Sequence, residues 1–402
     1  MLKKILLSII LLFFIINTSS CKKELPKTSS EQIIKETILS ENEFSLTINE
    51  QEKIKSENDC KDKLQMLLGI YKNAYKGNAS NVILTDKTIL KMQKKLKKAG
   101  CAVTTTIPYS NMENYKNIDS FLKSCSNKEV GSTVFYQIHS DGSVERNKLI
   151  FDGTNMYLLI TYATWNKEIK PIISYLSYNK ISKWDYTDKG WFGYELLIAQ
   201  PPETSAVTDA SCLIRIKPLS KEQRILSKKC VQMIGYQGNN LLSSNWNTEH
   251  LEKLDYTGIF EYFYEMKYKQ RLTSKDYPNG IPKKDFENLI MEYLPITKKQ
   301  LQKYATFDKK NKTYTWAWMN CLDYTPTFFG TSLPEVTEIK KNKDGTITLT
   351  VDAVYDMTFY DDALITSKLT IQFRKDGSFK YLGNKVIKDE LNCTSNYEYR
   401  IK

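Results

Sequence analysis

The feature that most constrains the fold is a change in hydrophobic period, which occurs twice along the chain. Residues 60–77 and 86–99 repeat apolar side chains at the spacing of an amphipathic helix. From residue 131 to about residue 199, apolar side chains recur at every second position, which is typical of half-buried strands. After residue 282 the same order restarts. We therefore expect an α+β fold made of two units, each with helices packed on an antiparallel sheet.

Four Asp-Gly pairs separate the apolar runs, and we expect each to form a hairpin turn in which both central residues take positive φ. The helices and strands of the second unit are predicted from the same two apolar spacings. In the second of these helices, Thr297 and Gln300 have the spacing of a capping box. The Asp-Gly pairs are 141–142, 152–153, 344–345 and 376–377; the helices are 283–293 and 297–305; the strands are 312–319, 335–341, 346–356, 364–374 and 378–387.

The segments between these blocks are less regular. A third short helix is predicted over 112–124, and a strand is predicted over 224–237. The stretch 251–270 has aromatic side chains on both faces, so helix and strand both remain open. Residues 273–282 contain Pro278, Asn279, Gly280 and Pro282, which favour a linker. We expect an N-terminal α+β domain over 57–272 and a C-terminal one over 283–402.

The first residues have the pattern of an export signal. Lys3 and Lys4 precede twelve apolar or small residues, 5–16, which as a helix would span roughly 18 Å, too short for a bilayer core. Residues 18–21, Thr-Ser-Ser-Cys, then resemble the lipobox of bacterial lipoproteins, although Thr18 stands where an aliphatic residue is usual. The alternatives are an ordinary secretory signal in which Cys21 is incidental, and an uncleaved N-terminal helix.

The lipoprotein resemblance implies a location and a membrane partner. It implies removal of residues 1–20 and a diacylglycerol on Cys21, with palmitate among the acyl chains that hold the protein on the outer, extracytoplasmic face of the cell membrane. Residues 21–56 are polar and highly charged, and we expect a flexible tether there. The string "IPKKDFENLIMEYLPIT", residues 281–297, looks like segments of uncharacterised lipoproteins of Gram-positive anaerobes. The C-terminal unit resembles the nuclear-transport-factor type of cone.

The net charge of +12 does not indicate a nucleic-acid partner. Only six of the 58 basic residues are Arg, the side chain that reads phosphates and bases in bidentate fashion. The lysines are scattered among acids instead of forming one block. Such a surface favours anionic wall polymers or lipid headgroups, so we expect no nucleic-acid binding.

Seven cysteines remain besides Cys21, and disulfides are permitted outside the cytoplasm. Antiparallel packing of the first two predicted helices would bring Cys60 beside Cys101. The pairs Cys212–Cys230 and Cys321–Cys393 are the other candidates, with Cys125 left over; the alternative is that all are buried free thiols. No CxxC pair is present and the chain has only two His, so we expect no metal site and no cofactor.

Motifs for catalysis are absent from the sequence. It contains no GxSxG, no HExxH and no phosphate-binding P-loop. His139 precedes a predicted hairpin turn and His250 a predicted helix, where surface roles are more common than catalysis. Asp352 and Asp356 share one face of a predicted strand, and we expect that face to be wet. We therefore predict that the protein is not an enzyme.

One aromatic row is a candidate ligand platform. Tyr314, Trp316 and Trp318 alternate along a predicted strand, which would place three rings on one face, as stacking on a sugar requires. The alternative is that the row fills the core between sheet and helices. A second aromatic set is expected to pack in a hairpin core: Trp184, Tyr186, Trp191, Phe192 and Tyr194.

Together these patterns predict a non-catalytic, lipid-anchored surface protein that binds a cell-wall glycan, another wall component or an envelope protein. The main alternative is an accessory or assembly subunit of an envelope complex for secretion, conjugation or sporulation. A hydrolase with an unrecognised site is a further alternative. A solute-binding lipoprotein would need parallel βαβ lobes, whereas the pattern predicts strand meanders.

Overall fold

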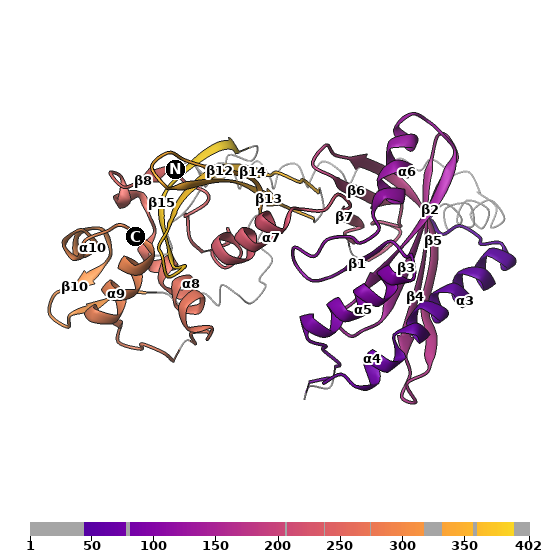
Figure 1. Cartoon of the computed structure of the whole chain (residues 1–402), viewed down its shortest axis with the longest axis horizontal. Helices are drawn as coiled ribbons and strands as arrows, with labels where there is room; N and C mark the ends of the chain where they lie inside the picture. The colour runs from indigo at the N-terminus through magenta and orange to yellow at the C-terminus, as the bar shows by residue number, and fades with distance from the viewer. Residues whose placement is uncertain are drawn as a thin grey trace, which may run out of the picture. The chain divides into compact units, whose positions relative to one another are not determined.

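The computed structural model describes residues 44–77, 81–205, 207–236, 238–273, 275–316, 332–356 and 360–389. These residues belong to one compact unit, which begins at Phe44. Two large sheets and their helices make up most of it (Figure 1). The predicted α+β class is confirmed.

The first sheet has seven strands in sequence order, β1 to β7. The strand β1 pairs in parallel with β2, and each later strand pairs in antiparallel fashion with its predecessor. The predicted meander is therefore present, with one parallel strand added at its edge. The strands are β1 (Val103–Thr105), β2 (Gly131–Ile138), β3 (Val144–Phe151), β4 (Met156–Trp165), β5 (Pro171–Tyr186), β6 (Trp191–Leu196) and β7 (Ser211–Arg215).

Helices cover both faces of this sheet. On one face, helices α3 to α5 bury Leu64, Met92 and neighbouring side chains against β2 to β4. On the other face, α6 packs Ile118 and Leu122 against Phe135 and against strands β6 and β7. The helices are α3 (Glu50–Met66), α4 (Leu68–Lys72), α5 (Asp86–Lys98) and α6 (Lys116–Ser126).

Two predictions about these helices can be compared with the structure. Helix α5 begins at Asp86, as predicted, and Thr85 caps it because its hydroxyl accepts the N–H of Thr88. By contrast α3 begins at Glu50, ten residues before the predicted start, with Asn49 as its N-cap. Part of the segment 21–56, predicted as a tether, is therefore helical.

The second sheet has five antiparallel strands in the order β12-β13-β14-β15-β8. Four of its strands occur where the sequence pattern places them, and the short β8 joins from a distant part of the chain. The strands are β12 (Leu333–Lys341), β13 (Ile347–Val354), β14 (Ile365–Phe373), β15 (Phe379–Asp389) and β8 (Trp246–Asn247).

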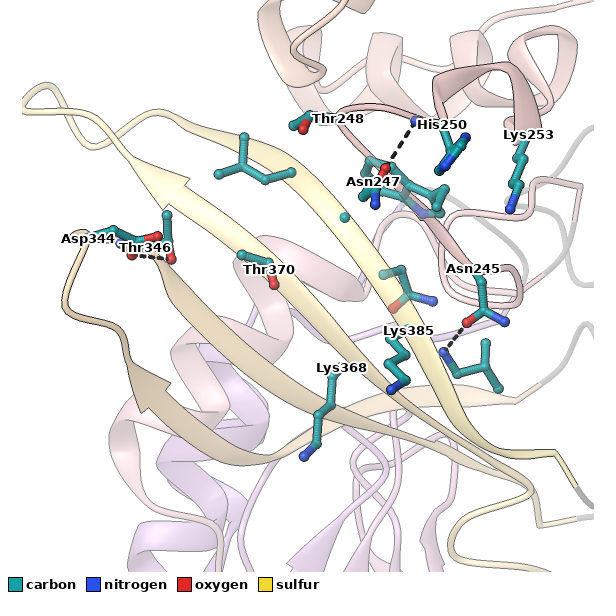
Figure 2. A pocket seen from close by; sticks show the side chains of 15 residues that line it. Asn245, Asn247, Thr248, His250, Lys253, Asp344, Thr346, Lys368, Thr370 and Lys385 are labelled. Atoms are coloured by element: carbon teal, nitrogen blue, oxygen red, sulfur yellow. Dashed lines mark hydrogen bonds between the residues drawn. The ribbon is translucent and has the colours of Figure 1, made fainter.

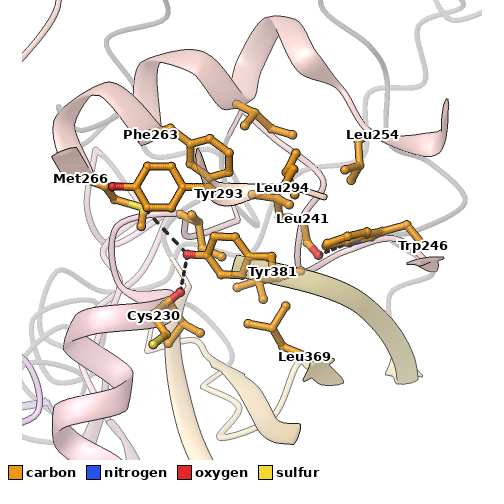
Figure 3. Close-up of a cluster of buried hydrophobic side chains, with 14 of the residues drawn as sticks. Cys230, Leu241, Trp246, Leu254, Phe263, Met266, Tyr293, Leu294, Leu369 and Tyr381 are labelled. Atoms are coloured by element: carbon orange, nitrogen blue, oxygen red, sulfur yellow. Dashed lines mark hydrogen bonds between the residues drawn. The ribbon is translucent and has the colours of Figure 1, made fainter. Parts of the chain in front are cut away.

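One face of the second sheet packs on helices around a buried tyrosine. The Tyr381 ring is stacked on the ring of Phe263 in α8, with 5.9 Å between the ring centroids. The Tyr381 hydroxyl donates to the carbonyl of Cys230 (Figure 3). Leu349 and Leu369 face the same core. The elements around it are α7 (Lys221–Leu226), a π-helical turn η1 (Ser227–Val231), a 3₁₀ turn η2 (Leu251–Lys253), α8 (Tyr256–Tyr268), α9 (Lys283–Tyr293) and α10 (Lys298–Tyr304).

Sequence predictions for this region had mixed outcomes. Helix α9 and the capping box of Thr297 and Gln300 at α10 are confirmed. The ambiguous stretch 251–270 contains the helix α8. The predicted strand over 224–237 is wrong, because the segment begins in α7 and continues as a π-helical turn, after a capping box formed by Ser220 and Gln223.

A small three-stranded sheet and a shared core complete the fold. The small sheet has the order β10-β11-β9, made of Phe307–Asp308, Thr313–Tyr314 and Ile281–Pro282. The core of the second sheet runs from Leu226 to Tyr381, so residues 226–272 pack with the C-terminal elements. The predicted domain boundary at 273–282 stays a prediction about how the chain divides, as does the cone resemblance.

The hairpin turns at Asp-Gly pairs form, but with a different geometry from the one predicted. Gly142 has φ of +80°, and its N–H bonds to the carbonyl of His139, while Asp141 is not at positive φ. Instead the Asp141 carboxylate accepts the N–H of Ser143. Asp344 and Asp376 accept N–H groups two residues on in the same way. Only the glycine therefore needs the left-handed conformation, and the aspartate holds the turn by its side chain.

Candidate functional site

The predicted aromatic platform does not form around Tyr314. This residue is completely buried, its ring stacks on Phe286 at 4.2 Å, and its hydroxyl donates to Glu287. The strand ends at Tyr314, so the alternation does not continue, and Trp316 donates its indole N–H to the carbonyl of Tyr277. Trp318 lies outside the described residues. The alternative interpretation, packing in the core, explains Tyr314 and the half-buried Trp316.

The second aromatic set packs as expected in a hairpin core. Trp184, Phe192 and Tyr194 belong to or pack on the cluster beneath α6. Trp191 lies against Arg215, whose guanidinium carbon is 4.7 Å from its ring centroid. These rings therefore stabilise the first sheet and its surroundings.

The disulfides predicted for Cys60–Cys101 and Cys212–Cys230 are absent, because these cysteines and Cys125 are free thiols. The prediction placed Cys60 at the start of a helix, whereas it lies in the middle of α3, where its thiol donates to the carbonyls of Val144 and Thr161. Burial raises the pKa of Cys60 to about 12. Cys321, Cys393 and the predicted lipidation site Cys21 lie outside the described residues.

The two histidines and Asp352 have partners within the fold, Glu252 being that of His250, whereas Asp356 is exposed. His139 lies 3.1 Å from Glu145, and its ring contacts Tyr162. The expectation of a wet strand face at Asp352 is wrong: Asp352 is buried, accepts the hydroxyl of Thr366 and pairs with Lys189 at 2.8 Å. Among the described residues, no three His, Cys, Asp or Glu side chains are grouped to hold a metal ion.

Two buried arginines form ion pairs and hydrogen bonds inside the fold. Arg215 forms a bidentate pair with Glu335, with one N–O distance of 2.8 Å, and also donates to the carbonyls of Lys189 and Lys217. Burial lowers the pKa of Arg215 to about 10. Arg146 bonds Asp59 at 2.7 Å and Ser56 at 3.0 Å. Because both side chains are buried and paired with carboxylates, they stabilise the fold and are not accessible as a binding site.

An open groove on the outer face of the second sheet differs from these clusters. Its volume is about 610 Å³, and its walls come from β14, β15, β8, η2 and the β12–β13 turn (Figure 2). Leu369 and Ile371 of β14 point into the core, so Lys368 and Thr370, which alternate with them, face the groove side. We refer to this feature as the outer-face groove.

The floor of the outer-face groove is low because of one glycine. In the strand register, Gly383 of β15 lies between Thr370 of β14 and Asn247 of β8. A Cβ at Gly383 would lie only 3.0 Å from the carbonyl oxygen of Trp246, so glycine lets β8 approach β15 closely. Two residues further along each strand, on the same face, Lys368 lies directly opposite Lys385, and both side chains are exposed.

Two amide oxygens in the groove lining are already engaged by backbone N–H groups. Asn245 Oδ1 accepts the N–H of Val386 at 2.8 Å. Asn247 Oδ1 accepts the N–H groups of Glu249 and His250 at 2.9 and 3.0 Å (Figure 2). These bonds fix both amides with their NH₂ groups as the remaining hydrogen-bonding groups. Asn245 and Asn247 therefore keep NH₂ groups that can donate to a ligand, whereas the buried Oδ1 of Asn384 has no hydrogen-bond partner among the described residues.

Sequence analysis did not find the outer-face groove. The alternation in "SKLTIQF", 367–373, indicates that Lys368 and Thr370 face outward, and that signal was available. The pairing of β15 with β8, however, joins residues more than a hundred positions apart, and no local pattern predicts it.

The described part of the chain is thus an α+β protein with two large sheets, in which nearly all strand pairs are antiparallel, and with a polar groove on the outer face of the second sheet. By sequence it belongs to DUF6070, a family of unknown function whose pattern matches residues 53–400. No curated protein and no solved structure matches the chain. Within the described ranges, no helix is long and apolar enough to cross a membrane.

Proposed function

We propose that the protein is a lipid-anchored, non-catalytic binding protein of the extracytoplasmic membrane face. In this proposal Cys21 carries the diacylglycerol, and the compact unit from Phe44 onward binds a component of the cell wall or envelope. The resemblance of residues 18–21 to a lipobox supports the anchor. The outer-face groove supports binding, and it is the observation that carries the proposal.

Several properties of the groove favour binding over catalysis. Its lining contains one carboxylate, Asp344, which accepts both the N–H and the hydroxyl of Thr346. These bonds lower the pKa of Asp344, so it stays ionised and does not act as a proton donor near neutral pH. Asn, Thr, Lys and His side chains supply the remaining polar contacts, and such groups suit recognition of a hydroxylated or anionic polymer.

Co-sedimentation of a soluble form, residues 22–402, with purified cell walls tests the binding. We expect retention that Thr370→Trp lowers at least tenfold, because the indole would fill the groove floor without changing the net charge. Thr133→Trp on β2 is the matched control, since Thr133 is also half-exposed on a strand, and it should bind like the wild type. Equal retention of both variants would remove the groove from the proposal, and no retention of the wild type would refute wall binding.

The anchor has a separate test. Labelling cells with a radioactive or clickable palmitate should mark the wild-type protein and leave Cys21→Ser unlabelled, with the variant released from the membrane fraction. A labelled Cys21→Ser protein would contradict lipidation at this cysteine.

A further inference from the structure

Lys368 and Lys385 form a like-charged pair that the fold itself does not neutralise. They are direct cross-strand partners in the β14–β15 ladder, where like charges repel. Neither lysine forms a hydrogen bond or ion pair with any residue that the structure describes. Figure 2 shows the two side chains on neighbouring strands at the edge of the groove. An anion placed between the two ammonium groups would relieve this repulsion.

One further lysine of the lining adds to the positive potential. Lys253 reaches the groove from the η2 segment, and His250 lies beside it. His250 Nδ1 lies 3.1 Å from Glu252, a residue outside the lining, and Asp344 is held in its own turn by Thr346. The acidic groups nearest the groove are therefore already engaged, whereas Lys368 and Lys385 are not.

The neutral polar groups favour an acceptor-rich ligand as well. Since the Oδ1 atoms of Asn245 and Asn247 accept backbone N–H groups, their NH₂ groups remain to donate. Thr370 adds a hydroxyl next to the glycine floor. A ligand with several oxygen acceptors on one anionic centre matches this arrangement, and a phosphate ester has that chemistry, for which lysine is a common point-charge partner.

We infer that the outer-face groove binds a phosphate ester, with the phosphoryl oxygens between Lys368 and Lys385 and a hydroxylated neighbour over Gly383. This inference rests on the proposed function and specifies the chemistry of its ligand. The groove volume of about 610 Å³ exceeds that of a single phosphate ion, so the groove has room for a phosphodiester with its hydroxylated neighbour. A phosphodiester-linked wall polymer and a phospholipid headgroup share this chemistry.

Calorimetric titration of the detergent-solubilised full chain with glycerol 3-phosphate tests the inference, with glycerol as the neutral probe. We expect binding of glycerol 3-phosphate alone, weakened at least tenfold in Lys368→Gln/Lys385→Gln. The control Lys87→Gln/Lys91→Gln removes the same charge from the exposed side of α5 and should bind like the wild type. Equal weakening in both double variants, no weakening in the groove variant, or no binding of glycerol 3-phosphate would overturn the inference.

Competition then separates the two sources of the phosphodiester. Displacement by poly(glycerol phosphate) at lower phosphate concentration than by glycerophosphoglycerol, the deacylated headgroup of phosphatidylglycerol, assigns a wall polymer. The reverse order assigns a lipid headgroup, and displacement by neither overturns the inference.

The two proposals fail in distinguishable ways. Wall retention that Thr370→Trp abolishes but the lysine variant leaves unchanged would keep the binding function and reject the phosphate ester. Binding of glycerol 3-phosphate without wall retention would do the opposite.

Discussion

Two cationic clusters, one on each large sheet, differ in whether their charges are matched. Beneath α3, Arg146 of β3 is buried and bonds Asp59 and Ser56, and Asp59 also accepts bonds from Lys63 and Tyr136. On the second sheet, Lys368 and Lys385 lie opposite each other, exposed and without a partner in the described chain.

The comparison separates two uses of positive charge in one molecule. A cation surrounded by a carboxylate and hydroxyls contributes to folding, and its removal leaves buried polar atoms without partners. A cation pair without a counter-charge costs stability slightly and remains available to a ligand. Substitutions in the first cluster should therefore destabilise the protein, whereas neutralising the second should stabilise it and weaken binding.

The largest expected effect is that of Arg146→Met, which should lower the free energy of unfolding by about 3 kcal/mol, the lower part of the range for breaking a buried ion pair. The expected loss lies at the lower end of that range because Asp59 still accepts hydrogen bonds from Lys63 and Tyr136 in the variant. Urea denaturation followed by circular dichroism measures it. Lys148→Met, on the same strand and paired with Glu52 nearer the surface, should cost under about 1 kcal/mol. Similar losses in both variants would contradict the contrast.

A smaller effect is expected on the pH dependence of stability, through the ionisation of Asp59. Although burial raises the pKa of Asp59, hydrogen bonds from Lys63, Tyr136 and Arg146 outweigh it, and its pKa in the folded protein lies below the ordinary 3.8. A lowered pKa stabilises the fold above about pH 4, and this contribution is lost as the pH falls through the folded-state value. Unfolding curves at pH 5 and pH 3 should show a smaller decrease for Asp59→Asn than for the wild type. An equal decrease would mean that Asp59 is not coupled to folding.

Neutralising the groove pair should act in the opposite direction. Lys385→Gln should raise the free energy of unfolding by roughly 0.2–1 kcal/mol, since it removes a like-charge cross-strand pair. Thermal or urea unfolding measures it against Lys87→Gln, an exposed helix lysine that should change stability little. Destabilisation by Lys385→Gln would show that this lysine has a structural partner after all.

The smallest predicted effect concerns salt. Raising the ionic strength from 0.1 M to 1 M shortens the Debye length from about 10 Å to about 3 Å, so the repulsion between the exposed lysines is screened. The stability difference between wild type and Lys385→Gln should therefore shrink in urea titrations at high salt. The difference between wild type and Arg146→Met should change less, because that cluster is buried. A salt-independent lysine difference would argue against an electrostatic origin.

Local patterns predicted much of the fold. The alternation around the Asp-Gly pairs located both meanders, and the spacing of Phe286, Leu289 and Ile290 located α9. The strand prediction over 224–237 is wrong because a run of apolar residues does not distinguish a buried strand from a buried helix. The capping-box spacing of Ser220 and Gln223 indicates the helix. The prediction of an exposed aromatic row at Tyr314 is wrong because tertiary contacts with Phe286 and Glu287 bury this side chain.

The candidate site was less predictable than the fold. The pairing of Lys368 with Lys385 depends on the register shift between Thr370 and Ile371 in the β14–β15 ladder, which neither composition nor hydrophobic period reveals. Gly383 and Asn247 come together only because β8 crosses to β15. The groove is therefore a property of long-range register, whereas the patterns available in the sequence are local.

The shortness of β8 has a consequence for solubility. The strand β15 spans eleven residues, Phe379–Asp389, and β8 covers it through two pairs only, at Gly383 and Asn384. Among the described residues, the Val386 N–H is taken by Asn245, and the other backbone groups along that edge could pair with a strand of another molecule and start aggregation. Lys385, exposed on the same strand, opposes such stacking because a second copy would bring identical charges together. The lysine that recruits an anion in our proposal would then also keep neighbouring copies of the protein apart.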